Sequence, residues 1–380
     1  MRPRSVVAKP YLLGVEDHWP AFHQPIARGR DGPLNPTWLV VGLPSTLYTG
    51  GSIRAGMIFA DLCARDRVVA IRSRNVAAGL RTLAKRPKLI CGPTRLATAR
   101  ILPMAPLKLA SKLCEPAVID IHDHPVLQSA ALGLPLSKAD AERVLRDYEY
   151  HVATFSVLIA QTESFADLAG LPRAKTLIIP NGADPHRFRL APMPATPTVG
   201  LVSGAAPGRG IELLIDAVRE ARSEVADLRL KMAISAPSEP LRTYFRGLVS
   251  KTAGDRWIEI VSLNYDEVPR FLEGVSIAAV PHPPGDYMDA VVPVKLFDSM
   301  MSGRPLVVTP RTETTRVVTT HDAGEVASGD SPSDLAEAIV RLTRDPERAI
   351  RLGRQAREAA ISHYAWDVLS RRITDHMLAH

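Results

Sequence analysis

The chain is poor in cysteine and in aromatic residues, and it contains no long apolar run. Its three cysteines, Cys63, Cys91 and Cys114, lie far apart, so they form neither a disulfide framework nor a spaced metal site, and reduced, buried thiols are expected. No run of about 18 or more apolar residues is present, and no apolar core follows the basic first residues, so neither a membrane span nor a signal peptide is predicted. The default expectation is a cytoplasmic protein.

The size of the chain predicts more than one domain. Its 380 residues are many for a single core and suggest two domains of ordinary size. Apolar residues make up 46% and charged residues 23% of the chain, which is typical of globular proteins that fold in water.

Positive charge gathers in the first third of the chain. Residues 1–115 hold 18 Lys and Arg against 6 Asp and Glu, a formal charge of +12, whereas the remainder carries −5. This asymmetry indicates an anionic partner for the N-terminal part. Only Tyr48 and Phe59 are aromatic between residues 40 and 115, so the stacking platforms of single-strand binders are missing and nucleic acid is not expected. An anionic membrane surface or a lipid-phosphate acceptor is favoured, and the basic segment from Arg95 to Leu113 suits either bilayer contact or an ordinary covering helix.

Short apolar runs alternate with helical patterns, which predicts an α/β protein with parallel sheets. We expect an N-terminal arm at residues 1–36, a first Rossmann-like domain at 37–190, a second Rossmann-like domain at 191–365 and a last helix at 366–380. The expected strands span residues 38–43, 68–71, 88–91, 157–161, 176–179, 198–203, 228–234, 258–262, 275–280 and 306–308, with one more beginning at 117. The expected helices span residues 53–64, 75–84, 137–151, 163–168, 211–221, 241–249, 267–273, 294–301, 331–343 and 346–363.

The stretch from Pro281 to Pro310 contains the clearest functional pattern. It predicts a strand end, a polar Pro/Gly loop, a short helix, a tight turn and a buried strand. Lys295 and Asp298 are three residues apart, so they lie on one side of the first turns of this helix, beside its positive end. A lysine, free backbone N–H groups and a carboxylate together can hold a phosphate and a ribose hydroxyl. An exposed ion pair between the two residues is the alternative.

Two glycine-rich loops follow strands and enter helices, an arrangement that places backbone N–H groups against a phosphate. The first contains Gly50 and Gly51, with Arg54 early in the next helix and facing donor or acceptor. The second runs from Gly204 to Gly210 and carries Arg209 at the helix entrance. In both cases a glycine turn without a ligand is the alternative.

A buried strand from Ala117 delivers four polar residues at its C-terminal end, where ligands bind in open α/β sheets. They are Asp120, His122, Asp123 and His124. On an extended segment the two histidines lie on one side and Asp123 on the other, and no second cluster completes a coordination shell. No metal site is therefore predicted.

These motifs resemble the retaining, GT-B-fold glycosyltransferases of group 1, the family 4 class. In Pro293-Val-Lys-Leu-Phe-Asp298, Asp298 takes the second acidic position of the family's paired-Glu motif, and the following Gly-Arg-Pro turn matches. Ala290 stands where the first Glu is expected, with Asp289 beside it as a candidate sugar contact. Arg209-Gly210 matches the family's helix start, and the segment from Pro180 to Phe188 matches the crossing between its two domains.

The resemblance implies a fold of two domains facing across a cleft, with the last helix packing back on the first domain. It implies transfer of a sugar from a UDP- or GDP-sugar, which is a substrate rather than a cofactor, to a glycan, glycolipid or lipid-linked acceptor, with retention and without a metal. Arg209 and Lys295 then neutralise the departing diphosphate, Asp298 binds the ribose, and the loop at Asn264 receives the base. His122 and Asp123 are the catalytic candidates, and the basic first domain suggests peripheral attachment at the inner membrane face.

Two alternatives remain at this stage. A nucleotide-sugar epimerase of the same fold needs no basic acceptor surface. A non-catalytic relative would bind an acidic partner through residues 54–112, and two departures from the family pattern favour it: the missing first Glu, and the missing Arg after Gly204, where Ala205 stands.

Overall fold

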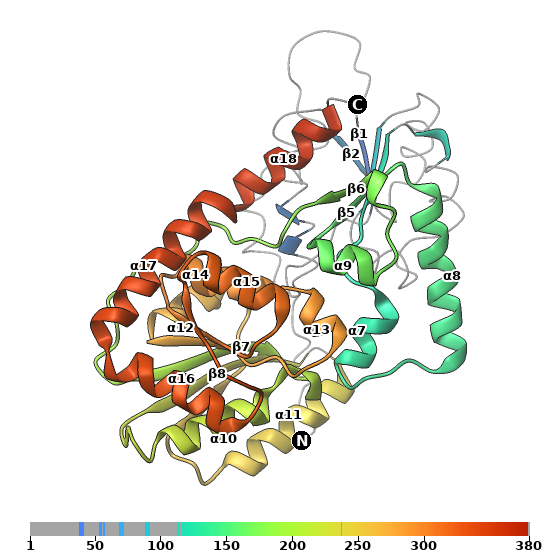
Figure 1. The fold of residues 1–380 in the computed structure, drawn as a ribbon. Coiled ribbons are helices and arrows are strands. Elements are labelled where there is room, and N and C mark those ends of the chain that lie inside the picture. Colours follow the sequence, from blue (N-terminus) through green and yellow to red (C-terminus); the bar gives the residue numbers. More distant parts are fainter. Residues whose placement is uncertain are drawn as a thin grey trace, which may run out of the picture.

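The computed structural model describes residues 38–41, 53–54, 56–57, 68–71, 88–91, 112–114, 116–236 and 238–378. Within these ranges the chain forms two parallel-sheet domains (Figure 1). The expected α/β architecture is therefore confirmed. The predicted arm at 1–36, Gly50 and Gly51, the helix at 75–84 and most of the basic segment at 95–113 lie outside the described residues.

The first domain contains a six-stranded sheet in the order β2-β1-β3-β4-β5-β6, and every neighbouring pair is parallel. All four residues of β4 are buried, as expected for a central strand of a sheet covered on both faces. The strands are β1 (Trp38–Val41), β2 (Val68–Ile71), β3 (Lys88–Cys91), β4 (Ala117–Asp120), β5 (Val157–Ala160) and β6 (Thr176–Ile178).

The second domain repeats this arrangement with the strand order β12-β11-β10-β7-β8-β9, again parallel throughout. The carboxyl ends of β7, β10 and β11 consequently meet at one edge of the sheet, where α/β proteins bind ligands. The strands are β7 (Thr198–Gly204), β8 (Arg229–Ser235), β9 (Ile258–Val261), β10 (Ile277–Val280), β11 (Leu306–Val308) and β12 (Gly324–Val326).

Helices cover both faces of the second sheet. On one face α10, α11 and α16 share a core with the sheet, and the apolar residues of α10 recur every three or four positions from Ile211 to Val218. On the other face lie α12, α14, α15 and α17. The helices of this domain are α10 (Ile211–Ala221), α11 (Glu239–Thr252), α12 (Val268–Glu273), α13 (Asp286–Ala290), α14 (Val294–Met301), α15 (Thr312–Thr320), α16 (Pro332–Arg344) and α17 (Pro346–His363).

The core of the first domain is completed by a segment of the second. Tyr287 and Met288 of α13 are buried in the same apolar cluster as Phe165. The Phe165 and Tyr287 rings meet edge to face, with 6.4 Å between their centroids. The two domains are therefore joined by apolar packing at the ends of their sheets as well as by the chain. The first-domain helices in the described range 116–178 are α7 (Pro125–Ala131), α8 (Lys138–Thr154) and α9 (Glu163–Leu168).

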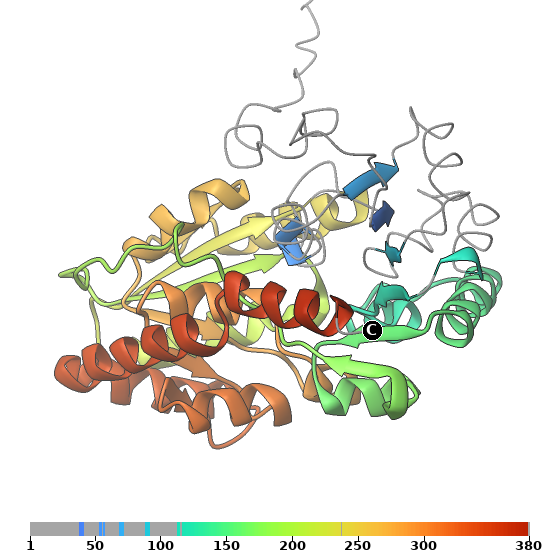
Figure 2. The ribbon, with the colours of Figure 1, turned by 90° about the horizontal axis from the view of Figure 1, so that it is seen from above.

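The chain crosses between the domains twice, and the two crossings lie side by side. Ala183 and Ala365 form a parallel bridge, in which the Ala183 N–H donates to the Tyr364 carbonyl at 2.9 Å and the Trp366 N–H donates to the Ala183 carbonyl at 3.0 Å. Beyond this point α18 (Trp366–Leu378) runs back along the first domain (Figures 1 and 2). The return of the last helix, expected from the resemblance, is confirmed.

The linker after the first crossing is fastened to the second domain. The buried Arg304 guanidinium donates to the carbonyls of Leu272, Glu273 and Pro192, and Arg357 donates to the carbonyl of Phe188 at 3.1 Å. Because residues 188–192 are tied to the second domain, the junction between the domains is confined to the paired crossing at Ala183 and Ala365.

Some predicted local structure was wrong. The segment before α14 is not wholly a loop, because residues 286–290 form α13, whose five residues are too few for a periodic pattern and are held by packing on the first domain. Three further elements, α7, α15 and β12, were not predicted. In α15 seven of nine residues are Thr or Val, which favour strands, so tertiary packing overrides local preference there.

Candidate functional site

Polar residues from both domains gather where the strands end. Ile121 to His124 follow β4, the glycine-rich loop follows β7, and Pro281 and Thr309 come directly after β10 and β11. Lys295 and Asp298 approach the same region from α14. The predicted phosphate residues are therefore brought together, because Arg209 and Asp298 both lie near enough to Lys295 to shift its pKa.

Lys295 occupies the first turn of α14 and is partly buried. Within the described part of the chain, no carboxylate lies at ion-pair distance from its amine. Burial and the neighbouring Arg209 guanidinium lower the pKa of Lys295 to about 7, and Asp298 opposes them only in part. Its surroundings thus disfavour the charged form of this lysine unless an anion is present.

Asp298 lies one turn further along α14 and is 2% exposed. The Tyr265 hydroxyl donates to its carboxylate at 3.2 Å, and the Arg187 guanidinium lies over the Tyr265 ring, 4.6 Å from the centroid. Burial raises the pKa of Asp298 to about 7, although Tyr265, Arg187 and Lys295 favour its ionised form. An exposed ion pair with Lys295, the alternative considered from the sequence, is not formed.

The glycine-rich loop has two positions that only glycine can occupy. A Cβ at Gly208 would come within 1.8 Å of the Ala131 carbonyl oxygen in the first domain. Gly210 begins α10 with φ +68°, and a Cβ there would come within 1.7 Å of the Pro281 carbonyl oxygen. The loop therefore lies directly against the end of β10. Gly204 opens onto free space at the end of β7, and Arg209 sits in the single helical turn before Gly210.

His122 and Asp123 lie together at the end of β4, both buried. The His122 Nε2 is 3.5 Å from an Asp123 carboxylate oxygen, and its buried Nδ1 has no hydrogen-bond partner within the described residues. The Tyr287 hydroxyl of α13 donates to Asp123. Burial and the Asp123 charge raise the pKa of Tyr287 well above its usual value, so it remains a donor. The Asp123 carboxylate of the first domain is thus held by a hydroxyl group of the second domain.

Arg54 is also buried, but its guanidinium has a partner of its own. Its Nε donates to both Asp120 oxygens at 3.0 and 2.9 Å, and Nη1 donates to the Pro180 carbonyl at 2.9 Å. Asn181 accepts a longer bond from the same nitrogen at 3.4 Å. The structure therefore places Arg54 against the first crossing between domains, and its buried Nη2 has no hydrogen-bond partner within the described residues.

The remaining predicted residues have structural partners. Asp289 accepts from the Thr312 N–H at 3.1 Å and lies 3.6 Å from Arg311, which fixes the start of α15. Asn264 is exposed and caps the short turn at Tyr265–Glu267, in a reciprocal capping box with Glu267.

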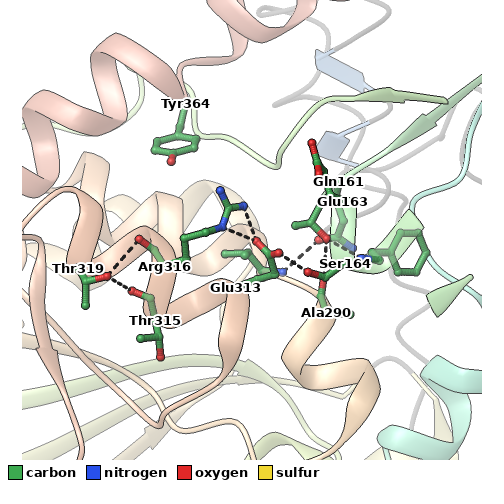
Figure 3. A network of polar contacts seen from close by, with 12 residues as sticks. Gln161, Glu163, Ser164, Ala290, Glu313, Thr315, Arg316, Thr319 and Tyr364 are labelled. Carbon is green, nitrogen blue, oxygen red and sulfur yellow. Dashed lines mark hydrogen bonds and ion pairs between the residues drawn. The ribbon is translucent and has the colours of Figure 1, made fainter. Parts of the chain in front are cut away.

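Figure 3 shows a second set of contacts between the domains, around Ala290 and Glu313. The Thr162 hydroxyl donates to the Ala290 carbonyl at 2.5 Å, and the Ser164 hydroxyl donates to Glu313 at the same distance. Arg316 donates to the other Glu313 oxygen at 3.0 Å. Ala290, at the predicted position of the first Glu, thus joins the domains through its backbone.

Sequence reasoning missed several residues of this region. His282, Tyr287 and Arg311 contribute to it, together with Glu313 at the domain contact. The signal available for His282 was its position directly after a strand of the second sheet. Tyr287 and Glu313 carried none, because their partners are 164 and 149 residues away.

No three His, Cys, Asp or Glu side chains in the ranges given above are grouped as metal ligands. Among the helices of the same ranges, none has the length and apolarity needed to span a bilayer.

Comparisons with known proteins show which proteins this chain resembles. Residues 196–345 match the family described as "Glycosyl transferases group 1". The GDP-mannose-dependent alpha-(1-6)-phosphatidylinositol monomannoside mannosyltransferase of Mycolicibacterium smegmatis is 25% identical over 314 residues, which cover 77% of this chain and 79% of the relative. Its counterpart in Mycobacterium tuberculosis is 25% identical over 292 residues, 73% of this chain and 72% of that protein.

Solved structures agree on the fold. Anabaena Alr3699/HepE in complex with UDP-glucose superposes with a TM-score of 0.68 at 14% identity, covering 90% of this chain and 99% of that one. Sucrose-phosphate synthase from Thermosynechococcus elongatus gives 0.64 at 14% identity, with 90% and 98% covered. The chain therefore has the GT-B fold, with two parallel-sheet domains, and its residues 196–345 match the group 1 glycosyltransferases.

Proposed function

We propose that this enzyme transfers a hexose from a nucleoside-diphospho-sugar to a glycolipid acceptor, with retention of the anomeric configuration and without a metal. The observation that carries the proposal is Lys295: a partly buried amine, beside Arg209, without a carboxylate at ion-pair distance in the described structure. A site with this charge distribution is suited to an anion that arrives from outside the protein.

The second domain supplies the groups that bind the donor. Arg209, Lys295 and the N–H groups at the start of α10 hold the diphosphate, and Asp298 accepts from the ribose hydroxyls. Negative charge grows on the diphosphate as the bond to the anomeric carbon breaks. Fixed cations that meet this developing charge lower the barrier to sugar departure.

The first domain supplies the face that meets the sugar and acceptor. His122 and Asp123 follow the end of β4 and lie beside α13. The Tyr287 hydroxyl of α13 donates to Asp123 across the domain contact. In the proposal, His122 orients a sugar hydroxyl and Asp123 holds His122 in place. The leaving phosphate assists removal of the acceptor proton on the same face of the sugar, which accounts for retention.

The donor and acceptor classes are proposed from the relatives and the charge pattern. The mycobacterial relatives are named for GDP-mannose and a phosphatidylinositol mannoside, and the superposed Anabaena protein binds UDP-glucose. A formal charge of +12 on residues 1–115 supports an acceptor with an anionic headgroup, presented at a membrane surface. We therefore propose GDP-mannose as the donor and a phosphatidylinositol glycolipid as the acceptor.

The test is a donor screen followed by turnover. Thermal unfolding of the full chain is measured with GDP, UDP, GDP-mannose and UDP-glucose, with and without EDTA, and release of nucleoside diphosphate is then measured with and without phosphatidylinositol mannoside. We expect thermal stabilisation either by GDP and GDP-mannose or by UDP and UDP-glucose. Release of the nucleoside diphosphate should require the acceptor and should be unaffected by EDTA. Interconversion of sugars without acceptor would favour the epimerase, and an inverted product anomer by NMR would exclude retention.

A further inference from the structure

We propose that His282 is a further contact of the donor diphosphate, acting as an uncharged hydrogen-bonding group among the cations of the site. This inference rests on the proposed function, because it assigns a residue to the same donor site.

The backbone places His282 next to the glycine-rich loop. It is the second residue after β10, and the carbonyl of the preceding Pro281 occupies the space where a side chain at Gly210 would lie. The His282 carbonyl accepts from the Thr309 hydroxyl at 2.6 Å, which joins it to the end of β11. The residue is thus fixed between two strand ends, at the start of α10.

The side chain lacks a partner that its burial requires. His282 is 5% exposed, and its buried Nδ1 has no hydrogen-bond partner in the described structure. A buried polar atom left unpaired costs about 1–3 kcal/mol, so such an atom needs a reason. His321, in the same domain, shows the usual solution, because its Nε2 lies 2.9 Å from the Tyr364 hydroxyl.

Three cations surround the imidazole. Burial first, and then Arg209, Lys295 and Arg311, lower the pKa of His282 to about 3. Arg311 is offset by Asp330 at 2.5 Å and by Asp289 at 3.6 Å. The ring is therefore neutral at physiological pH, and it can donate to a phosphate oxygen without adding a fourth charge to the cluster.

The glycine-rich loop explains why such a donor is needed. Arg209 is the only charged residue between Gly204 and Gly210, and the neighbouring Ala205 is buried and apolar. The loop therefore offers one side-chain contact to a ligand that carries two phosphates. His282 follows β10, the strand next to β7 in the sheet, and supplies a contact from the adjoining side.

The experiment compares three replacements at this position in the full chain. His282→Phe keeps the ring and removes both nitrogens, whereas His282→Asn and His282→Gln place an amide near Nδ1 or Nε2. Affinities for GDP, UDP and the matching nucleosides are measured by calorimetry or competition, with thermal unfolding of each variant. His321→Asn is the matched control.

We expect His282→Phe to weaken binding of the preferred nucleoside diphosphate by about 10- to 100-fold, with a much smaller effect on the nucleoside. One of the two amide variants should stay within about threefold of the parent, because a single hydrogen bond to an anionic oxygen is restored. His321→Asn should bind both ligands as the parent does.

Several outcomes would overturn the inference. Unchanged diphosphate binding by His282→Phe, equal losses for diphosphate and nucleoside, or losses in both amide variants as large as in the Phe variant would each assign His282 to packing. Parent enzyme that binds no nucleoside diphosphate would overturn the proposed function as well. If the Phe variant does not fold, the ring ¹⁵N shifts of His282 in the parent decide: they must move when the diphosphate is added.

Discussion

Arg54 and Lys295 are both cations withdrawn from water, and both were predicted to face a ligand. Arg54 is 0% exposed and is held by the two Asp120 oxygens and the Pro180 carbonyl. Lys295 has no such carboxylate within the described structure, and burial together with the neighbouring Arg209 lowers its pKa to about 7. The fold stabilises the charged form of Arg54, whereas it disfavours the charged form of Lys295.

This difference is the one expected between a charge that serves the fold and a charge that serves the proposed donor site. Removing one partner of a buried, hydrogen-bonded ion pair is strongly destabilising, because the other charge is left buried without compensation. A buried charge whose surroundings oppose it persists only when something outside the fold needs it, and such groups concentrate at functional sites. The same contrast holds between Asp120, paired with Arg54, and Asp298, whose pKa burial raises to about 7.

The largest effect is expected at Arg54. Arg54→Met leaves the Asp120 carboxylate buried without its counter-ion, which should lower the free energy of unfolding by about 3–5 kcal/mol. Urea or thermal unfolding measures the loss. The double variant Arg54→Met, Asp120→Asn should recover part of it, since no charge is then left unpaired. Full stability of Arg54→Met, together with weaker diphosphate binding, would show that Arg54 belongs with Lys295.

At Lys295 the effect should appear in binding and not in stability. Lys295→Met should weaken nucleoside-diphosphate binding about 100-fold by calorimetry and change nucleoside binding little, because only the diphosphate meets the amine. The melting temperature of the free protein should not fall, because the substitution removes a charge that burial and Arg209 disfavour. Lys231→Met is the control, because Lys231 forms an ion pair with Glu259 at 3.2 Å on the surface. Equal losses for diphosphate and nucleoside would remove the phosphate role.

Tyr287 tests the contact between the two regions. Tyr287→Phe removes the hydroxyl that donates to Asp123 and keeps the ring in the first domain's core. We expect kcat/KM to fall by about 10-fold with donor binding nearly unchanged, because the catalytic face loses its support and the diphosphate site does not. Tyr148→Phe, which removes a hydroxyl bonded to the Ala169 carbonyl at 3.0 Å, should leave kcat/KM unchanged. A loss confined to donor affinity would contradict the assignment.

Helices and strands were predicted from the sequence better than contacts between side chains. The start of α10 at Ile211 and the bounds of α9 follow from local signals, an apolar period and a glycine or threonine at the entrance. The grouping of Arg209, Lys295 and Asp298 was implied by the resemblance to the family, and it agrees with the rule that parallel strands end at one edge. The role of Arg54 could not be predicted, because its partner Asp120 is 66 residues away and no local pattern records the pairing.

The same limit applies to Asp289. Its place beside Ala290 suggested a sugar contact, yet its carboxylate accepts from the Thr312 N–H and lies near Arg311. Both partners belong to the start of α15, a helix that its Thr- and Val-rich sequence conceals. A role that depends on an unpredicted helix could not be assigned in advance.

The smallest expected effect is the pH dependence of diphosphate binding, which tests the lowered pKa of Lys295 directly. Lys295, with a pKa lowered to about 7, is protonated at pH 6 and mostly neutral at pH 8. An anion prefers the protonated amine, so diphosphate affinity should fall by up to about tenfold between these pH values, and binding at pH 8 should take up a proton. Calorimetry in buffers of different ionisation enthalpy measures this uptake.

Two variants assign that pH dependence to its source. Lys295→Arg carries a guanidinium that stays protonated at pH 8, so its diphosphate affinity should lose the decline between pH 6 and 8. Asp298→Asn should keep the decline, because the amine remains. The two residues affect the stability of the folded enzyme in opposite directions. The raised pKa of Asp298 stabilises the fold at low pH, where this carboxyl is protonated, and the effect is lost as pH rises through about 7. The lowered pKa of Lys295 stabilises the fold at high pH, where this amine is neutral, and the effect is lost as pH falls through about 7. The ligand-free enzyme should therefore gain least from this pair near pH 7, and a diphosphate, which favours the protonated lysine, should remove the part of that minimum due to Lys295.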